Sequence, residues 1–190
     1  MSARIAKLVP YRLSICGLHE LDGFCEDGVS HVVSILDTGH GTVEVFERFG
    51  PHHREDFRFD DVVEELPGRL LPSEDEVARL LRFGERLAAD GADHVLVHCF
   101  MGVSRSTAAA AILLAQHNPG REPDVFEALN DIRPRNWPNR AMIGHADRLL
   151  GREGALFRAM VDQHRSITRR YPDMAELIRS VGRGHEVPTD

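Results

Sequence analysis

The stretch HVLVHCFMGVSRSTAAAAILLAQ, residues 94–116, combines a short strand, a tight loop and a helix. Residues 95–97 (VLV) form an apolar run that is typical of a strand buried on both faces. The alanine- and leucine-rich segment 106–116 predicts a helix that is apolar nearly all round. A strand that leads through a short loop into a helix N-terminus builds an anion site, because the first N–H groups of the helix are unpaired and its dipole is positive there.

The residues of the loop indicate which chemistry this anion site serves. Cys99 opens the loop and Arg105 closes it, with Ser106 next. A thiol at a helix N-terminus beside a guanidinium ionises readily, so we expect Cys99 to be a thiolate that faces a pocket for a tetrahedral oxyanion. Arg105 offers a planar fork of donors for two oxygens of a phosphate. Gly102 lets the backbone turn inward without a side chain that would fill the pocket.

The motif HCxxGxSRS, residues 98–106, resembles the signature of the cysteine-dependent protein tyrosine phosphatases, and the serine before the arginine is most similar to the dual-specificity branch. The resemblance extends over about residues 10–150 and implies no metal and no cofactor. It implies that Cys99 is the nucleophile, that Ser106 stabilises the thiolate when it departs, and that His98 orients the loop by hydrogen bonds. The phosphate-binding residues that it implies are Phe100, Met101, Gly102, Val103, Ser104 and Arg105.

A thiolate that attacks a phosphate monoester also needs a proton donor for the departing oxygen, and a nearby carboxylic acid can supply it. In the phosphatases that this chain resembles, this acid is an aspartate on a loop that precedes the cysteine. Asp60 and Asp61 lie in that part of the chain, at the end of an expected strand. The resemblance favours Asp61 as the acid, and Asp60 stays the alternative.

A second stretch, residues 132–139, resembles the dual-specificity phosphatases through its Arg-Pro and Pro-Asn pairs before a helix. By this resemblance Asn139 braces the loop over residues 98–105, which we call the phosphate loop, through hydrogen bonds. The alternative is that Asn139 is simply the N-cap of the helix that follows.

The order of the expected elements predicts an α/β fold. Strands are expected over residues 13–16, 31–36, 54–59 and 95–97, with a further short strand over 42–46. Helices are expected over residues 74–90, 106–116, 123–132, 140–150, 154–170 and 173–181, and the connection 17–28 has room for a short one. Strands that alternate with helices predict a central, parallel-rich sheet of about four or five strands flanked by helices. The resemblance to the protein tyrosine phosphatases implies the same fold.

We expect residues 1–182 to form one domain and residues 183–190 to be a flexible tail. The helices over 154–181 are not explained by any motif of the resemblance. A formal net charge of −7 argues against a nucleic-acid surface, and no apolar run is long enough to span a membrane. Three cysteines without a disulfide spacing fit a reducing compartment, so we expect a cytoplasmic protein. Cys16 or Cys25 could resolve an oxidised Cys99, although inert buried thiols are the simpler interpretation.

The resemblance, together with these residues, implies phosphate monoester hydrolysis on phosphoproteins through a phosphocysteine intermediate. A small phosphate monoester such as a phosphoinositide, a nucleotide or an RNA end is an alternative substrate. A catalytically weak module that binds phosphorylated residues is another alternative. The apolar loop residues Phe100, Met101 and Val103 disfavour highly anionic substrates. The sequence leaves the oligomeric state and the choice between phosphotyrosine and phosphoserine open.

Overall fold

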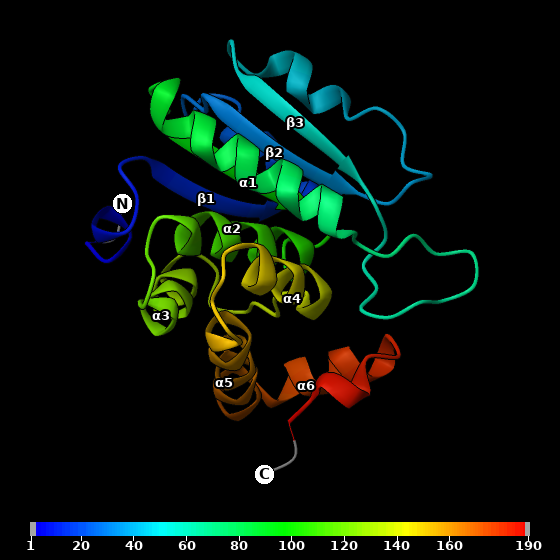
Figure 1. Ribbon diagram of the computed structural model, residues 1–190. Helices are drawn as coiled ribbons and strands as arrows, with labels where there is room; N and C mark the ends of the chain where they lie inside the picture. The colour runs from blue at the N-terminus through cyan, green and yellow to red at the C-terminus, as the bar shows by residue number, and fades with distance from the viewer. Residues whose placement is uncertain (1–2, 189–190) are drawn as a thin grey trace.

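The computed structural model describes residues 3–188 (of Ala88, the backbone alone), and its centre is a sheet of four parallel strands in the order β1-β4-β2-β3. The strands are β1 (Arg12–Gly17), β2 (His31–Leu36), β3 (His53–Arg58) and β4 (His94–Cys99). Because all four run in the same direction, their carboxyl ends meet at one edge of the sheet (Figure 1). The predicted α/β fold with a parallel sheet is confirmed.

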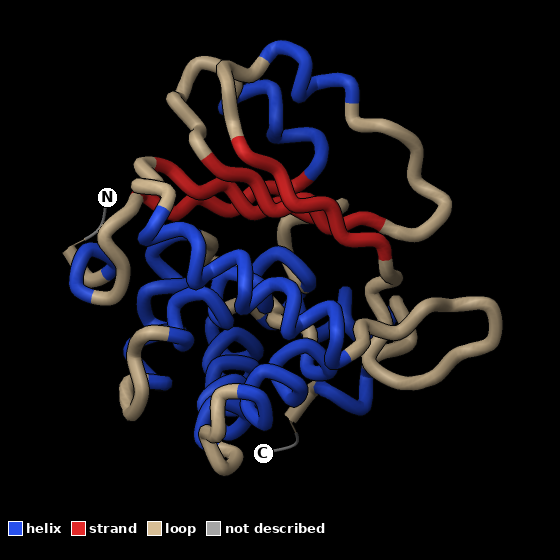
Figure 2. The backbone as a smooth tube through the Cα atoms, turned by 45° about the horizontal axis from the view of Figure 1, so that its top comes forward, coloured by secondary structure: helices blue, strands red, loops and turns tan. Residues whose placement is uncertain are grey.

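Helices cover one face of the sheet, and two of the short 3₁₀ turns, η2 (Leu18–Phe24) and η3 (Glu44–Arg48), cover the other (Figure 2). The helices are α1 (Glu74–Ala89), α2 (Arg105–Gln116), α3 (Glu122–Ile132), α4 (Arg140–Leu149), α5 (Ala155–Arg170) and α6 (Pro172–Ser180). The 3₁₀ turns are η1 (Ile5–Lys7), η2 (Leu18–Phe24), η3 (Glu44–Arg48) and η4 (Gly184–Glu186). A serine with a glutamate three positions later is typical of a helix start, and Ser73 is the N-cap of α1, where its side chain accepts a hydrogen bond of 3.2 Å from the Glu76 amide.

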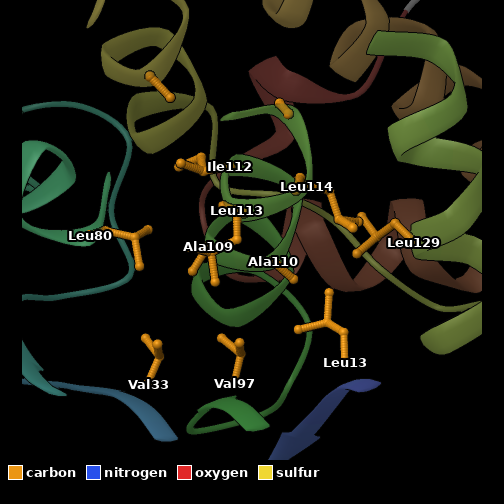
Figure 3. Packing of buried hydrophobic residues seen from close by; sticks show 14 of the residues in the cluster. Leu13, Val33, Leu80, Val97, Ala109, Ala110, Ile112, Leu113, Leu114 and Leu129 are labelled. Atoms are coloured by element: carbon orange, nitrogen blue, oxygen red, sulfur yellow. The ribbon is translucent and has the colours of Figure 1, made fainter. Parts of the chain in front are cut away.

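The two faces of the sheet follow the alternation of side chains along each strand. Val33 and Val97 pack on the helical face, against the helix α2 (Figure 3). Val32 and Leu96, their neighbours in the chain, pack on the opposite face beneath η2 and η3. Every residue of α2 from Arg105 to Ala115 is buried, because the helix lies between the sheet and the other helices. Its alanines let the helix approach the sheet closely, and this fixes the position of the helix N-terminus.

The strand expected over residues 42–46 is wrong. The chain forms the 3₁₀ turn η3 there, within the crossover that connects β2 to its parallel neighbour β3. The apolar side chains of this crossover, with Phe46 the most deeply buried of them, cover the second face of the sheet instead of extending its edge. The apolar residues of this segment therefore belong to a crossover that covers a sheet face and not to a strand.

The tail expected over residues 183–190 also differs from the structure over residues 183–188; residues 189–190 lie outside the described part. Gly182, with a φ of +81°, turns the chain back at the end of α6. Arg183 is then only 6% exposed and Val187 only 7% exposed. Val187 packs with Trp137 and the apolar residues of α5 and α6, so the last residues close a third apolar cluster.

The centre of this cluster generates a prediction about stability and pH. His164 in α5 stacks on Trp137, with ring centroids 3.9 Å apart, and burial lowers its pKa to about 3. The unfolded chain binds a proton at this histidine near pH 6.5, so the free energy of unfolding falls as the pH drops from about 6.5 towards 3.

We expect His164→Phe to reduce this pH dependence by up to about 1.4 kcal/mol per pH unit, because the ring stack is kept and the titrating group is removed. Urea unfolding at a series of pH values measures it. His117→Gln, at an exposed histidine, is the control and should leave the slope unchanged. An unaltered slope in His164→Phe would contradict the prediction.

Candidate active site

The site lies at the carboxyl edge of the sheet, where all four strands deliver residues. Cys99 is the last residue of β4, and its register partner Gly17 is the last residue of β1. Asp37 follows β2 directly. The aspartate pair 60–61 follows β3 after one further residue. In open parallel sheets this edge is where ligands bind, so the architecture itself brings these residues together.

The Cys99 thiol lies at the floor of the loop between β4 and α2. The residue is only 2% exposed. Its Sγ accepts a hydrogen bond of 3.2 Å from the Gly102 amide. The hydroxyl of Ser106 lies 3.1 Å from the same sulfur. The Gly102 amide and the Ser106 hydroxyl therefore both contact the sulfur.

Several backbone N–H groups of this loop are left without acceptors in the described part of the chain. Among the described residues, none accepts a hydrogen bond from the N–H groups of Phe100, Met101, Val103 or Ser104. The helix α2 begins directly after them, and its first N–H groups are unpaired by geometry. Unpaired amides that surround a buried sulfur at a helix N-terminus form a nest for a tetrahedral anion.

Close contact with the end of β1 fixes the shape of the loop. Gly102 has a φ of +70°, and a Cβ atom added there would lie 2.5 Å from the amide nitrogen of Gly17. The carbonyl of Phe100 accepts a hydrogen bond of 2.9 Å from the Leu18 amide. Only glycine at position 102 permits both the left-handed backbone and this approach.

A second brace holds the loop from the other side. Arg133 donates to the carbonyl of Met101 at 3.2 Å and to the carboxylate of Glu20 at 2.8 Å. Glu20 also accepts a hydrogen bond of 2.5 Å from the Gly17 amide. Burial raises the pKa of Glu20, but these hydrogen bonds outweigh it and the pKa lies below its usual value. The arginine of the second motif stretch therefore supports the loop that contains Cys99.

The Arg105 side chain is buried beside the loop and presents a free edge. Its Nη1 donates to Asp37 at 2.7 Å and to the carbonyl of Phe59 at 2.6 Å. Its Nε is buried without a hydrogen-bond partner among the described residues. The protein thus holds the guanidinium through Nη1 and leaves Nε to donate to a ligand. This arrangement fits the expectation that Arg105 donates to two oxygens of a phosphate. Asp37 was not predicted as a site residue, although its position directly after a buried strand was a usable signal.

The two adjacent aspartates have different partners. The carboxylate of Asp60, a residue only 4% exposed, accepts a hydrogen bond of 2.6 Å from the Leu70 amide. It therefore closes the long loop that follows β3 (Figure 1). Asp61 points to the phosphate loop, where its Oδ1 accepts a hydrogen bond of 2.7 Å from the Ser104 hydroxyl. The structure brings Asp61, and not Asp60, to the loop that contains Cys99.

Asn139 combines the two roles that the sequence left open. Its side-chain oxygen caps α4 by accepting from the amides of Ala141 and Met142. Its side-chain nitrogen donates to Asp61 Oδ1 at 3.0 Å. The backbone N–H of Asn139 donates to the Ser104 carbonyl at 3.3 Å. The side chain therefore braces the aspartate, and the backbone braces the phosphate loop.

His98 differs from its expected role. Its ring packs against Phe46, with centroids 5.5 Å apart, and neither ring nitrogen has a well-formed hydrogen bond within residues 3–188. Burial, only partly offset by the Cys99 backbone, lowers its pKa to about 4. The ring is therefore neutral at physiological pH and supports the loop by packing.

The other two cysteines face away from the site or lie outside it. Cys16 packs in the cluster on the opposite face of the sheet from Cys99. Burial raises its pKa to about 12, so it is a neutral thiol. Cys25, half-buried, packs against the same cluster as Cys16. Cys99 and the two other cysteines therefore pack on opposite faces of the sheet.

No group of three or more His, Cys, Asp and Glu side chains within residues 3–188 is arranged to hold a metal ion. None of the helices in this range is long and apolar enough to cross a bilayer.

Comparison with known proteins finds similarity in structure and not in sequence. No family model and no curated protein sequence matches the chain. A mouse putative dual specificity phosphatase complexed with zinc tungstate matches with a TM-score of 0.57 and 18% identity, over 80% of this chain and 89% of the other. Human DUSP28 matches with a TM-score of 0.57 and 16% identity, over 75% and 94% of the two chains. The chain has the fold of the dual-specificity phosphatases.

A third neighbour shows why the activity must be argued from the residues. The human tyrosine phosphatase-like serine/threonine/tyrosine-interacting protein matches with a TM-score of 0.55 and 17% identity, over 78% of this chain and 96% of the other. Its name describes a phosphatase-like protein. The fold therefore positions the site, and the side chains in it decide what it does.

The contact between Gly102 and β1 generates a testable prediction. Gly102→Ala should displace the loop, because the new Cβ meets the backbone of β1, and should abolish the binding of inorganic phosphate. Gly91→Ala is a matched control: φ is +66° there, and a Cβ would meet nothing within 4 Å. It should cost about 1–2 kcal/mol of stability and leave phosphate binding intact. Urea unfolding and a thermal-shift titration with phosphate measure both; wild-type binding in Gly102→Ala would refute the account of the loop.

Proposed function

We propose that this protein is a metal-independent phosphatase that hydrolyses phosphate monoesters through a covalent phosphocysteine. One observation carries the proposal. The buried Cys99 sulfur lies at the floor of a loop of unpaired amides, beside an arginine whose buried Nε also has no partner among the described residues. A buried donor such as Arg105 Nε is costly without a partner unless a ligand satisfies it, and a tetrahedral oxyanion fits this nitrogen together with the loop amides.

The proposed reaction has two steps. The Cys99 thiolate attacks phosphorus, the bond from phosphorus to the leaving oxygen breaks, and Asp61 gives that oxygen its proton. Water then attacks the phosphocysteine with Asp61 as base, and inorganic phosphate and the thiolate are released. Arg105 and the loop amides hold the three other oxygens in both steps, and Ser106 stabilises the departing thiolate.

The surroundings of the loop support a phosphorylated protein over a polyanionic small molecule. Phe100 is 44% exposed and Met101 is 53% exposed at the rim. Beside the loop lies a hollow of about 380 Å³, lined by side chains from the loop after β3, the phosphate loop and α6. Most of these side chains are apolar: Val62, Leu66, Met101, Val103, Leu177, Ile178 and Val181. An apolar rim suits a side chain of a protein, whereas inositol phosphates or nucleotides need more cations.

The nucleophile is tested by substitution at Cys99. Cys99→Ser should abolish turnover of an aryl phosphate and retain phosphate binding, because a hydroxyl is a far poorer nucleophile than a thiolate at this pH. Arg105→Lys should be nearly as damaging, since an ammonium cannot reproduce the planar fork. Turnover by the wild type should persist in chelator and be inhibited by vanadate. Activity in Cys99→Ser, or rescue of a chelated enzyme by a divalent ion, would exclude the proposed mechanism.

The acid is identified by comparing the two aspartates. The mechanism needs a thiolate and a protonated carboxyl together, so kcat/KM should be bell-shaped in pH. Asp61→Asn should remove the basic limb and lower kcat by about 10²–10³-fold on a substrate with a poor leaving group, with a smaller loss on an activated aryl phosphate. Asp60→Asn should keep the bell shape, because Asp60 holds the Leu70 amide. If only Asp60→Asn flattens the basic limb, the assignment is reversed.

A further inference from the structure

A buried arginine from the C-terminal segment reaches the candidate acid. Arg183 Nη1 donates to Asp61 Oδ1 at 3.0 Å and to the Ser104 hydroxyl at 2.9 Å. The Arg183 side chain is only 8% exposed, and the Asp61 side chain is 32% exposed. Residues 122 positions apart in the chain thus meet directly beside the phosphate loop.

The other edge of the same guanidinium is fixed by a second carboxylate. Nε and Nη2 of Arg183 donate to the two oxygens of Glu186, the latter bond being 3.0 Å long. Glu186 also accepts a hydrogen bond of 3.3 Å from the indole nitrogen of Trp137. Burial lowers the pKa of Arg183, but its hydrogen bonds and ion pairs outweigh burial and the pKa lies above its usual value. The arginine is therefore charged and held in one orientation.

The contacts of Asp61 show what this arrangement does. Three donors, from Ser104, Asn139 and Arg183, converge on Oδ1. Within residues 3–188 no donor meets Oδ2. An oxygen that accepts three hydrogen bonds has no room for a proton, so the acidic proton of Asp61 must be on Oδ2. The three donors thus fix which oxygen carries the proton and where the carboxyl plane lies.

Energetics also point to a role in positioning. A buried ion pair contributes little net stability, because desolvation of both charges offsets their attraction. Arg183 is buried and donates from Nη1 to Asp61, whose side chain is 32% exposed. This contact is better explained by the orientation it imposes on Asp61 than by a gain in stability. Figure 1 shows α6, which leads into this segment, on the same side of the molecule as the loop that contains Asp61.

We propose that Arg183 is a positioning residue for the proton donor, so that the C-terminal segment completes the active site. This inference rests on the proposed phosphatase function. It also assigns a role to α5 and α6, which no motif of the sequence explained: they place Arg183 against Asp61. Arg183 itself does not touch the reacting atoms.

The inference predicts an effect that depends on the leaving group. Arg183→Gln should lower kcat on phenyl phosphate by about tenfold or more, because its leaving oxygen needs the proton. On p-nitrophenyl phosphate, whose leaving group is stable as an anion, the loss should be small. KM should change little on both substrates. Arg183→Lys, which keeps a charged donor for Asp61 but not the fork on Glu186, should recover part of the loss.

A double-mutant cycle separates positioning from a general structural effect. If Arg183 acts through Asp61, then Asp61→Asn with Arg183→Gln should be no slower on phenyl phosphate than Asp61→Asn alone. Arg179→Gln, which removes an exposed arginine at the end of α6, is the matched control and should behave as the wild type. Thermal unfolding of each variant shows that the assay temperature lies below the transition.

Each outcome decides the inference. If Arg183→Gln lowers kcat equally on both substrates, and if this loss multiplies with that of Asp61→Asn in the double mutant, Arg183 has a general structural role and the inference is overturned. Wild-type rates in Arg183→Gln would overturn it and leave the phosphatase function standing. A faster rate on phenyl phosphate would overturn it by showing that the ion pair restrains the acid. If the wild type has no turnover that depends on Cys99, both this inference and the proposed function are refuted.

Discussion

The close approach of the phosphate loop to the end of β1 is the constraint on which the rest of the site depends. The parallel pairing of β1 with β4 places Gly17 opposite Cys99, and Gly102 then packs directly on the backbone of β1. This contact turns the loop so that its amides stay unpaired and the Gly102 amide reaches the Cys99 sulfur. The buried helix α2 fixes the other end of the loop. The site is thus a consequence of two rigid elements and one backbone contact.

Charge is distributed in the site in a way that the formal net charge of −7 does not suggest. Two buried arginines flank the phosphate loop, and each is held by at least one acidic side chain: Arg105 by Asp37, and Arg183 by Asp61 and Glu186. Held arginines keep a fixed geometry and lose little freedom when an anion binds. An acidic protein can therefore still direct a guanidinium donor, the Nε of Arg105, towards an anion, because the placement of single groups and not the net charge decides this.

Several elements were predictable from the sequence because their signals are local. The run VLV predicted the strand β4, and the alanine-rich segment after it predicted the helix α2. Ser73 indicated where α1 begins. The segment 42–46 has an equally local pattern, yet it became a crossover that covers a sheet face. Periodicity reports which side chains are buried, but not whether a hydrogen-bonding partner strand is available. The His98 ring is similar: its place before Cys99 was evident, whereas its neutral, packed state follows from burial on the far face.

The sequence by itself determined the loop that we propose as the nucleophile loop, since Cys99, Gly102, Arg105 and Ser106 lie within eight positions and can surround one anion. It also determined the class of fold, because alternation of strands and helices is written along the chain. Only the tertiary structure decided between Asp60 and Asp61 as the residue that faces the loop, because adjacent side chains differ in direction and not in sequence signal. It alone revealed Arg183, whose contact with Asp61 spans 122 positions and depends on how α5 and α6 pack against Trp137. Local spacing encodes chemistry within a loop, whereas contacts between distant segments are decided by the packing of the whole core.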